Sequence, residues 1–91
     1  MKICKHCLIS GHVQGVAFRY YTRKEAMNLN LTGWVRNLSD GRVEVWVYGE
    51  EAAVMKFSSW LSQGPATAQV IEVQCKTMTT NGNFESFEIT G

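Results

Sequence analysis

The sequence has almost no net charge and no long hydrophobic run. Its nine Lys and Arg residues nearly balance eight Asp and Glu residues, for a formal charge of +1. That balance gives no bulk attraction for nucleic acid or an anionic lipid surface, so any bound anion must be held by a local site. No apolar stretch approaches the roughly 20 residues that a transmembrane helix needs, and residues 1–6 do not open a signal peptide. We therefore expect a cytoplasmic protein.

Cysteine and histidine are also scarce, with three Cys and two His. Cys4 and Cys7 have the spacing of a thiol redox motif, but that chemistry places its first thiol at a helix N-terminus. In the strand expected here, the two side chains point to opposite faces, which makes them poor partners for each other or for one metal ion. An odd number of cysteines cannot all pair within one chain, which fits a reducing compartment. We expect Cys4, Cys7 and Cys75 to be structural, with no metal site.

The 91 residues predict one domain spanning residues 1–91, because a chain of this length buries a core without metal or disulfide cross-links. Glycine, proline and polar clusters divide the chain into stretches of strand and helix periodicity. The expected strands span residues 4–10, 31–38, 42–48, 69–76 and 84–90, and the expected helices span residues 20–30 and about 51–63. A tight hairpin is expected at residues 39–41 and a polar loop at residues 77–83.

The order strand, helix, strand, strand, helix, strand, strand predicts an α+β fold of the ferredoxin-like, split βαβ kind. Such a fold has an antiparallel sheet of four to five strands with two helices packed on one face. The first strand should lie inside the sheet, because neither of its faces is wholly polar. The residues expected to be buried on the helices are Phe18, Thr22, Ala26 and Leu29, then Ala53, Val54, Phe57, Trp60 and Leu61. Strand alternation places Val43, Val45 and Val47 on one face of the sheet, and Ile71, Val73 and Cys75 on one face of a later strand.

Residues 11–19 form a glycine-containing loop between the first strand and the first helix. At a helix start, the first N–H groups have no intrahelical partner and lie at the positive end of the helix dipole. Gly11 and Gly15 allow backbone turns in which successive amides converge on one anion. Arg19 adds a planar guanidinium that matches two phosphate oxygens. The alternative is an ordinary connecting loop with a surface arginine.

Asn37 is the second candidate, in the stretch of residues 32–41. It lies near the end of an expected strand on the same face as Val35. A carboxamide there can hold a water molecule in a fixed orientation without acting as a strong base. The alternative is structural, because an asparagine before a hairpin turn commonly hydrogen-bonds local backbone.

The residues Gly11-His12-Val13-Gln14-Gly15-Val16-Ala17-Phe18-Arg19 closely resemble the glycine loop and arginine of the acylphosphatase family. Gly33-Trp34-Val35-Arg36-Asn37, followed by Asp40-Gly41, resembles the second motif of that family. The two motifs occur in the expected order, and the resemblance extends over essentially the whole chain.

This resemblance implies a single-domain, ferredoxin-like hydrolase that cleaves the carboxyl-phosphate bond of acyl phosphates. It places the substrate-binding arginine at Arg19 and the water-positioning asparagine at Asn37. Backbone amides of Gln14, Gly15, Val16, Ala17, Phe18 and Arg19 are expected to cradle the phosphate. No cofactor or metal is expected, and we expect a monomer whose partners are small acyl phosphates or other tetrahedral oxyanions. Trp34, Arg36 and Asp40 are expected to support the fold.

Two other classes of function are compatible with the sequence. A ferredoxin-like sheet can stack nucleic-acid bases on exposed aromatic residues, and Trp46 and Tyr48 share a face. The near-zero net charge argues against that function. A non-catalytic anion sensor would need the cradle but not Asn37. The family's domain also occurs fused to carbamoyl-phosphate-processing domains, but no second domain follows residue 91, so we do not expect that arrangement.

Overall fold

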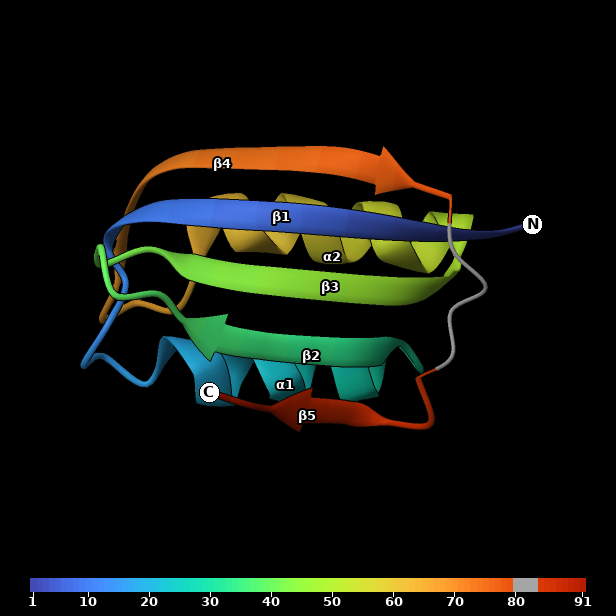
Figure 1. Ribbon diagram of the computed structural model, residues 1–91, viewed down its shortest axis with the longest axis horizontal. Helices are drawn as coiled ribbons and strands as arrows, with labels where there is room; N and C mark the ends of the chain where they lie inside the picture. Colours follow the sequence, from blue (N-terminus) through green and yellow to red (C-terminus); the bar gives the residue numbers. More distant parts are fainter. Residues whose placement is uncertain (80–83) are drawn as a thin grey trace.

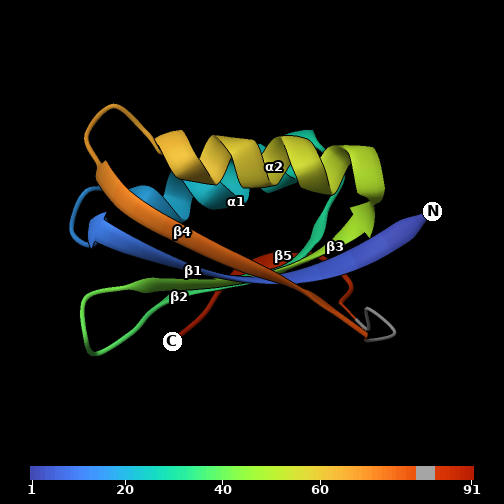
Figure 2. The ribbon, with the colours of Figure 1, turned by 90° about the horizontal axis from the view of Figure 1, so that it is seen from above.

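The computed structural model describes residues 1–79 and 84–91 and arranges them in two layers, a five-stranded sheet and two helices (Figure 1). Both helices lie on the same face of the sheet (Figure 2). The elements are β1 (Lys2–His12), α1 (Phe18–Asn28), β2 (Thr32–Asn37), β3 (Val43–Glu50), α2 (Glu51–Gln63), β4 (Gln69–Met78) and β5 (Phe87–Ile89). The predicted order of elements and the ferredoxin-like class are confirmed. No helix in residues 1–79 or 84–91 is long and apolar enough to cross a membrane.

The sheet is mixed, so the prediction of an antiparallel sheet is wrong at its last strand. The strand order is β4-β1-β3-β2-β5, with β5 parallel to β2 and every other neighbouring pair antiparallel. β4 and β5 are the two edge strands, and β5 pairs with β2 from Phe87, which lies beside Gly33. The strand expected over residues 84–90 is shorter in the structure, where β5 spans Phe87–Ile89. Of the expected polar loop, residues 77 and 78 belong to β4, whereas residues 80–83 lie outside the described residues.

The core lies between the sheet and the two helices, as the periodicity predicts. Val43, Val45 and Val47 are fully buried on the helix-facing side of β3. The buried residues of the helices are Phe18, Thr22 and Ala26 on α1 and Val54, Phe57 and Leu61 on α2, while Leu29, Ala53 and Trp60 pack against this core partly exposed. β1 lies between β4 and β3, which confirms its predicted interior position.

A β-bulge interrupts the pairing of β1 with β4. The structure here corrects two predictions. Gly11 pairs with Val70 and Ser10 with Glu72, so Ile71 has no partner on β1 and is 80% exposed. Ile71 therefore does not share the buried face of Val73, because the extra residue reverses the alternation. Gly11 lies within β1 and not in the loop. A Cβ there would collide with the Gln69 carbonyl oxygen, so close approach of β4, and not an anion, requires this glycine.

A disulfide bond joins Cys7 of β1 to Cys75 of β4, at positions that face each other across the two strands. Cys7 is fully buried in the core, whereas Cys75 is exposed on the edge strand. Cys4 is a buried free thiol, and burial raises its pKa. The sequence pattern did not reveal this pairing, because the cysteines are 68 residues apart and only the sheet register brings them together.

Candidate active site

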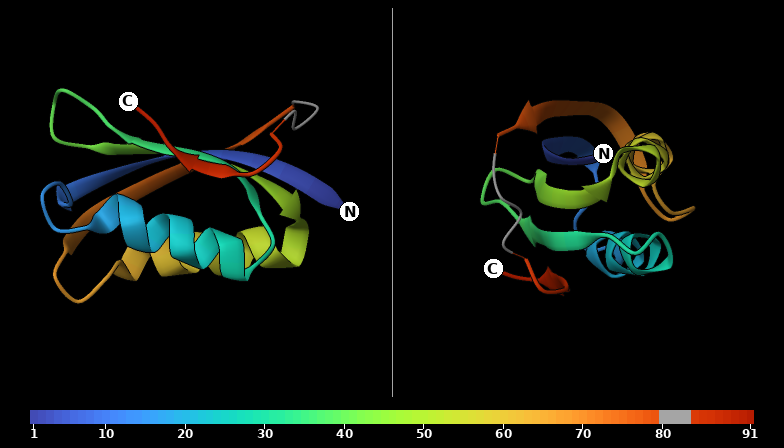
Figure 3. Two further views of the ribbon diagram at one scale, coloured as in Figure 1. Left: turned by 90° about the horizontal axis from the view of Figure 1, so that it is seen from below. Right: turned by 90° about the vertical axis from the view of Figure 1, so that its right-hand side faces the viewer.

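The connection between β1 and α1 folds into an irregular turn at one end of the sheet (Figure 3). Gly15 has a φ of 75°, which a glycine adopts freely, and Ala17 has a φ of 62°, which is unusual for a residue with a Cβ. Ala17 is the N-cap of α1, and its carbonyl accepts the first helical hydrogen bond, from the Tyr21 amide at 3.2 Å. The amides of the first turn of α1 therefore lack intrahelical partners, as an anion site requires.

Arg19 and Asn37 line the same cavity, whose volume is about 180 Å³. Arg19 is the second residue of α1 and Asn37 is the last residue of β2, so two distant segments bring them together. The complete lining is Val13, Gly15, Ala17, Phe18, Arg19, Tyr20, Asn37 and Ile89. Gln14 and Val16, two of the residues predicted to form the backbone cradle, are not part of this lining.

The Oδ1 atom of Asn37 is buried and accepts no hydrogen bond from any residue in the described ranges. A buried carboxamide oxygen without a partner is unfavourable by about 1–3 kcal/mol. Among the predicted site residues, it is the one buried side-chain polar atom that the described residues leave without a hydrogen bond. The hydrogen-bonding capacity of this oxygen is therefore unused by the described part of the fold.

Gln14 connects the glycine loop to the hairpin that follows Asn37. Its side-chain Nε2 donates to the carbonyl oxygens of Leu38 at 2.7 Å and of Arg42 at 2.9 Å. These two carbonyls lie at the ends of the β2–β3 turn, which is also closed by a 2.8 Å bond from the Leu38 amide to the Arg42 carbonyl. The sequence predicts only a backbone amide from Gln14. Its side chain instead holds the strand end that carries Asn37 against the loop.

Val13, Tyr20 and Ile89 also line the cavity and were not predicted as site residues. Tyr20 is 55% exposed and Ile89 is 42% exposed, so both lie at the solvent side of the cavity. Ile89 reaches the site because β5 pairs in parallel with β2, with Ile89 beside Val35. Tyr20 could have been found from its position next to Arg19. Ile89 could not, because its place depends on the pairing of a three-residue strand.

The residues predicted to support the fold do not line the cavity. Arg36 donates from Nε to Glu44 at 2.6 Å, and its guanidinium lies 5.2 Å from the ring centroid of Trp34. His6 makes a second 2.6 Å contact with Glu44. Burial raises the pKa of Glu44, but its hydrogen bonds with His6 and Arg36 outweigh burial and leave that pKa below its usual value.

Asp40 belongs to the turn between β2 and β3. Its carboxylate accepts hydrogen bonds from the Arg42 amide at 3.1 Å and from the Arg42 Nε at 2.8 Å. The backbone hydrogen bond from Arg42 is the main reason that the pKa of this exposed carboxyl is lowered. Asp40 therefore stabilises the hairpin next to the site.

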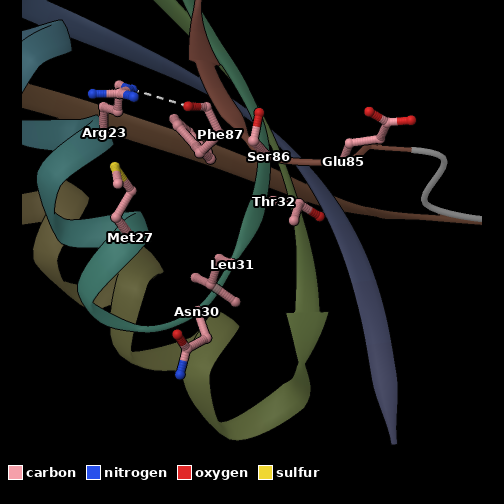
Figure 4. Close-up of a pocket in the computed structure, with 8 residues that line it drawn as sticks. All are labelled: Arg23, Met27, Asn30, Leu31, Thr32, Glu85, Ser86 and Phe87. Atoms are coloured by element: carbon pink, nitrogen blue, oxygen red, sulfur yellow. Dashed lines mark hydrogen bonds between the residues drawn. The ribbon is translucent and has the colours of Figure 1, made fainter.

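A second cavity, of about 270 Å³, lies near the other end of α1 (Figure 4). Thr32, the first residue of β2, lines this second cavity. Asn37, at the opposite end of β2, lines the first cavity. The arginine of this cavity, Arg23, donates from Nε to the Phe87 carbonyl at 3.0 Å, and Figure 4 shows Glu85 extending away from it. Neither Arg19 nor Asn37 lines this cavity, so it is not the predicted site.

The sequence is similar to known proteins over nearly its whole length. The sequence profile of the acylphosphatase family matches residues 5–89. The chain belongs to the acylphosphatase family. An acylphosphatase from Nitrosococcus oceani is 48% identical over 89 residues, which cover 98% of this chain and 99% of that protein.

Solved acylphosphatase structures superpose over nearly the whole chain. The enzyme from Coxiella burnetii has a TM-score of 0.93 at 40% identity, with 98% of this chain and 93% of the other covered. The acylphosphatase from Bacillus subtilis has a TM-score of 0.94 at 31% identity, with 98% and 99% covered. Family membership makes this protein a hydrolase of small-molecule acyl phosphates.

Proposed function

We propose that this acylphosphatase holds the phosphoryl group of its substrate with the backbone amides of residues 14–19 and the Arg19 guanidinium, while Asn37 positions the attacking water. The observation that carries the proposal is that Arg19 and the unsatisfied carboxamide of Asn37 line one cavity. Arg19 supplies the permanent positive charge, and the amides at the start of α1 supply directed donors.

The reaction demands little acid or base catalysis from the protein. The departing carboxylate has a conjugate acid with a pKa of about 4, so it leaves without a proton donor. Phosphoryl transfer depends chiefly on positioning and on stabilising charge on the phosphoryl oxygens. The proton of the attacking water passes to a phosphoryl oxygen, so the substrate itself acts as the base.

Asn37 has the capacity to orient water but not to deprotonate it. Its Oδ1 accepts a hydrogen bond from the water, and this leaves a lone pair of the water oxygen free to attack phosphorus. Fixing the nucleophile in line with the scissile bond lowers the entropic barrier to reaction. The cradle acts on the phosphoryl group in both ground and transition states, whereas Asn37 acts on the nucleophile. Substitutions in the cradle and at Asn37 should therefore affect KM and kcat differently.

Hydrolysis of benzoyl phosphate by the purified chain in EDTA tests the reaction and its metal independence together. We expect turnover well above the spontaneous rate, and inhibition by inorganic phosphate that competes with substrate. Loss of activity in EDTA that returns with a divalent cation would contradict a metal-free mechanism. Binding of phosphate without any hydrolysis would instead favour a non-catalytic anion sensor.

We also propose a monomer in the cytoplasm that acts without cofactor, nucleic acid or membrane partner. The balanced charge supports the last two points. The Cys7–Cys75 disulfide is the observation that opposes the cytoplasmic part of this proposal, because a reducing compartment keeps thiols unpaired. Thiol trapping in intact cells, combined with fractionation, therefore tests the location. Sedimentation of the purified protein tests its oligomeric state.

A further inference from the structure

The connection between α2 and β4 lies at the same end of the molecule as the glycine loop (Figure 2, Figure 3). The two segments are joined by one hydrogen bond, from the Thr67 hydroxyl to the Val16 carbonyl at 2.8 Å. Thr67 lies 51 residues from Val16 and does not line the cavity. Neither of the two family motifs includes Thr67.

This hydrogen bond fixes the orientation of a peptide group in the cradle. A trans peptide directs its carbonyl oxygen and the following N–H to opposite sides, and the described residues contain no cis peptide. With the Val16 carbonyl directed to Thr67, the Ala17 N–H must point the other way. Ala17 lines the cavity, and the proposed function assigns its amide to the anion held there.

The same peptide adjoins a residue in an unfavourable backbone conformation. Ala17 has a φ of 62°, and such a conformation persists only where the surroundings enforce it. A rotated Val16–Ala17 peptide would turn a carbonyl oxygen toward the anion and repel it. A hydrogen bond on the Val16 oxygen opposes that rotation.

Thr67 sits on a turn that is itself well anchored. The Gly64 amide donates to the Trp60 carbonyl at 2.8 Å and ends α2, and the Ala68 amide donates to the Pro65 carbonyl at 3.0 Å. Ala68, the residue after Thr67, is partly buried and packs against the core. The donor hydroxyl therefore belongs to a turn that is fixed to the core and does not depend on the loop.

We propose that Thr67 is a positioning residue of the phosphate cradle, acting through the Val16 carbonyl to hold the Ala17 amide toward the substrate. This inference rests on the proposed function, because it assigns the cradle amides to the phosphoryl group. Thr67 does not line the cavity, so it acts on the substrate only through Val16 and Ala17. Its removal should weaken binding of the phosphoryl group and leave the Asn37-directed step unchanged.

The test compares Thr67→Val, which keeps the shape and loses the hydroxyl, with Thr67→Ser, which keeps the hydroxyl. Loss of one neutral hydrogen bond predicts that Thr67→Val raises KM for benzoyl phosphate and Ki for inorganic phosphate in parallel, by about three- to ten-fold. Its kcat should stay within about twofold of the wild-type value, because the transition-state contacts of Asn37 remain. Thr67→Ser should restore both constants.

An amide NMR titration with inorganic phosphate gives a readout independent of turnover. The Ala17 N–H resonance should move on phosphate addition in the wild type and in Thr67→Ser, and move less in Thr67→Val at equal occupancy. Unchanged KM and Ki in Thr67→Val, or a Thr67→Ser variant that behaves like Thr67→Val, would overturn the role of Thr67 alone. A wild-type protein that neither binds phosphate nor hydrolyses benzoyl phosphate would overturn the proposed function as well.

Discussion

Helix α1 borders a cavity near each end, and an arginine lines each cavity. The two arginines differ in their hydrogen bonding. Arg23 donates from Nε to the Phe87 carbonyl and thereby anchors β5 to the helix. Arg19 makes no hydrogen bond to any residue in the described ranges and lies among amides at the helix start. Positive charge alone does not make an anion site. The donors must also be unpaired, convergent and at the positive end of the helix dipole.

The largest expected effect comes from exchanging the two arginines for alanine in turn. Arg19→Ala should lower kcat/KM for benzoyl phosphate by about a thousandfold, because it removes the fixed charge and the bidentate donor of the cradle. Arg23→Ala should lower stability and leave kcat/KM within about threefold, because its donor is committed to Phe87. Kinetics of both variants, with unfolding in urea as the control for stability, provide the measurement. Equal losses of activity would mean that the two ends do not differ in function.

Asn37→Ala should give the next largest effect, with a different kinetic pattern. We expect kcat to fall by about a hundredfold while KM changes by less than about threefold, because Asn37 acts on the water and not on the bound phosphoryl group. Steady-state kinetics on benzoyl phosphate measure both constants. An undiminished kcat would rule out the assignment of Asn37 to the nucleophile.

The Cys7–Cys75 disulfide distinguishes stability from site chemistry. Cys75→Ser should lower the free energy of unfolding by about 2 kcal/mol, because the disulfide closes a long loop in the unfolded chain. Activity at moderate temperature should remain, since neither cysteine lines the cavity. Urea unfolding of the wild type with and without a reductant serves as a matched control. If reduction has no effect on stability but abolishes hydrolysis, the disulfide acts on the site and not on the fold.

Gln14→Ala should disturb the cavity of Arg19 and Asn37 indirectly. The variant loses the two hydrogen bonds to Leu38 and Arg42, and kcat/KM should fall about fivefold as the strand end carrying Asn37 gains freedom. Gln14→Glu is the matched control, because it keeps the length of the side chain but replaces the donating amide with a group that accepts. Both variants should be weaker than wild type. A fully active Gln14→Glu variant would exclude the hairpin contact as the cause.

The sequence predicted the elements and the pair Arg19 and Asn37, because both depend on local pattern and on motifs. It missed contacts that depend on pairing between distant segments. Ile89 enters the cavity through the parallel register of β5, and Cys75 meets Cys7 through the register of β4. Thr67 reaches Val16 through the course of a turn after α2. Periodicity places a residue on a face, but it does not say which strand will lie beside that face.

The smallest expected effect concerns the face of the sheet opposite the helices. This face carries charged residues, but the cavity of Arg19 and Asn37 does not lie on it. The folded-state pKa of Glu44 is lowered, so its contribution to stability is present above its unfolded pKa and is lost as the pH falls through the folded value. Glu44→Gln should therefore lower the free energy of unfolding at neutral pH by less than about 1 kcal/mol, since Arg36 is half exposed. The variant should also show a shallower loss of stability below about pH 4. Urea unfolding across pH measures this, and a steeper acid loss in Glu44→Gln would reverse the assigned sign.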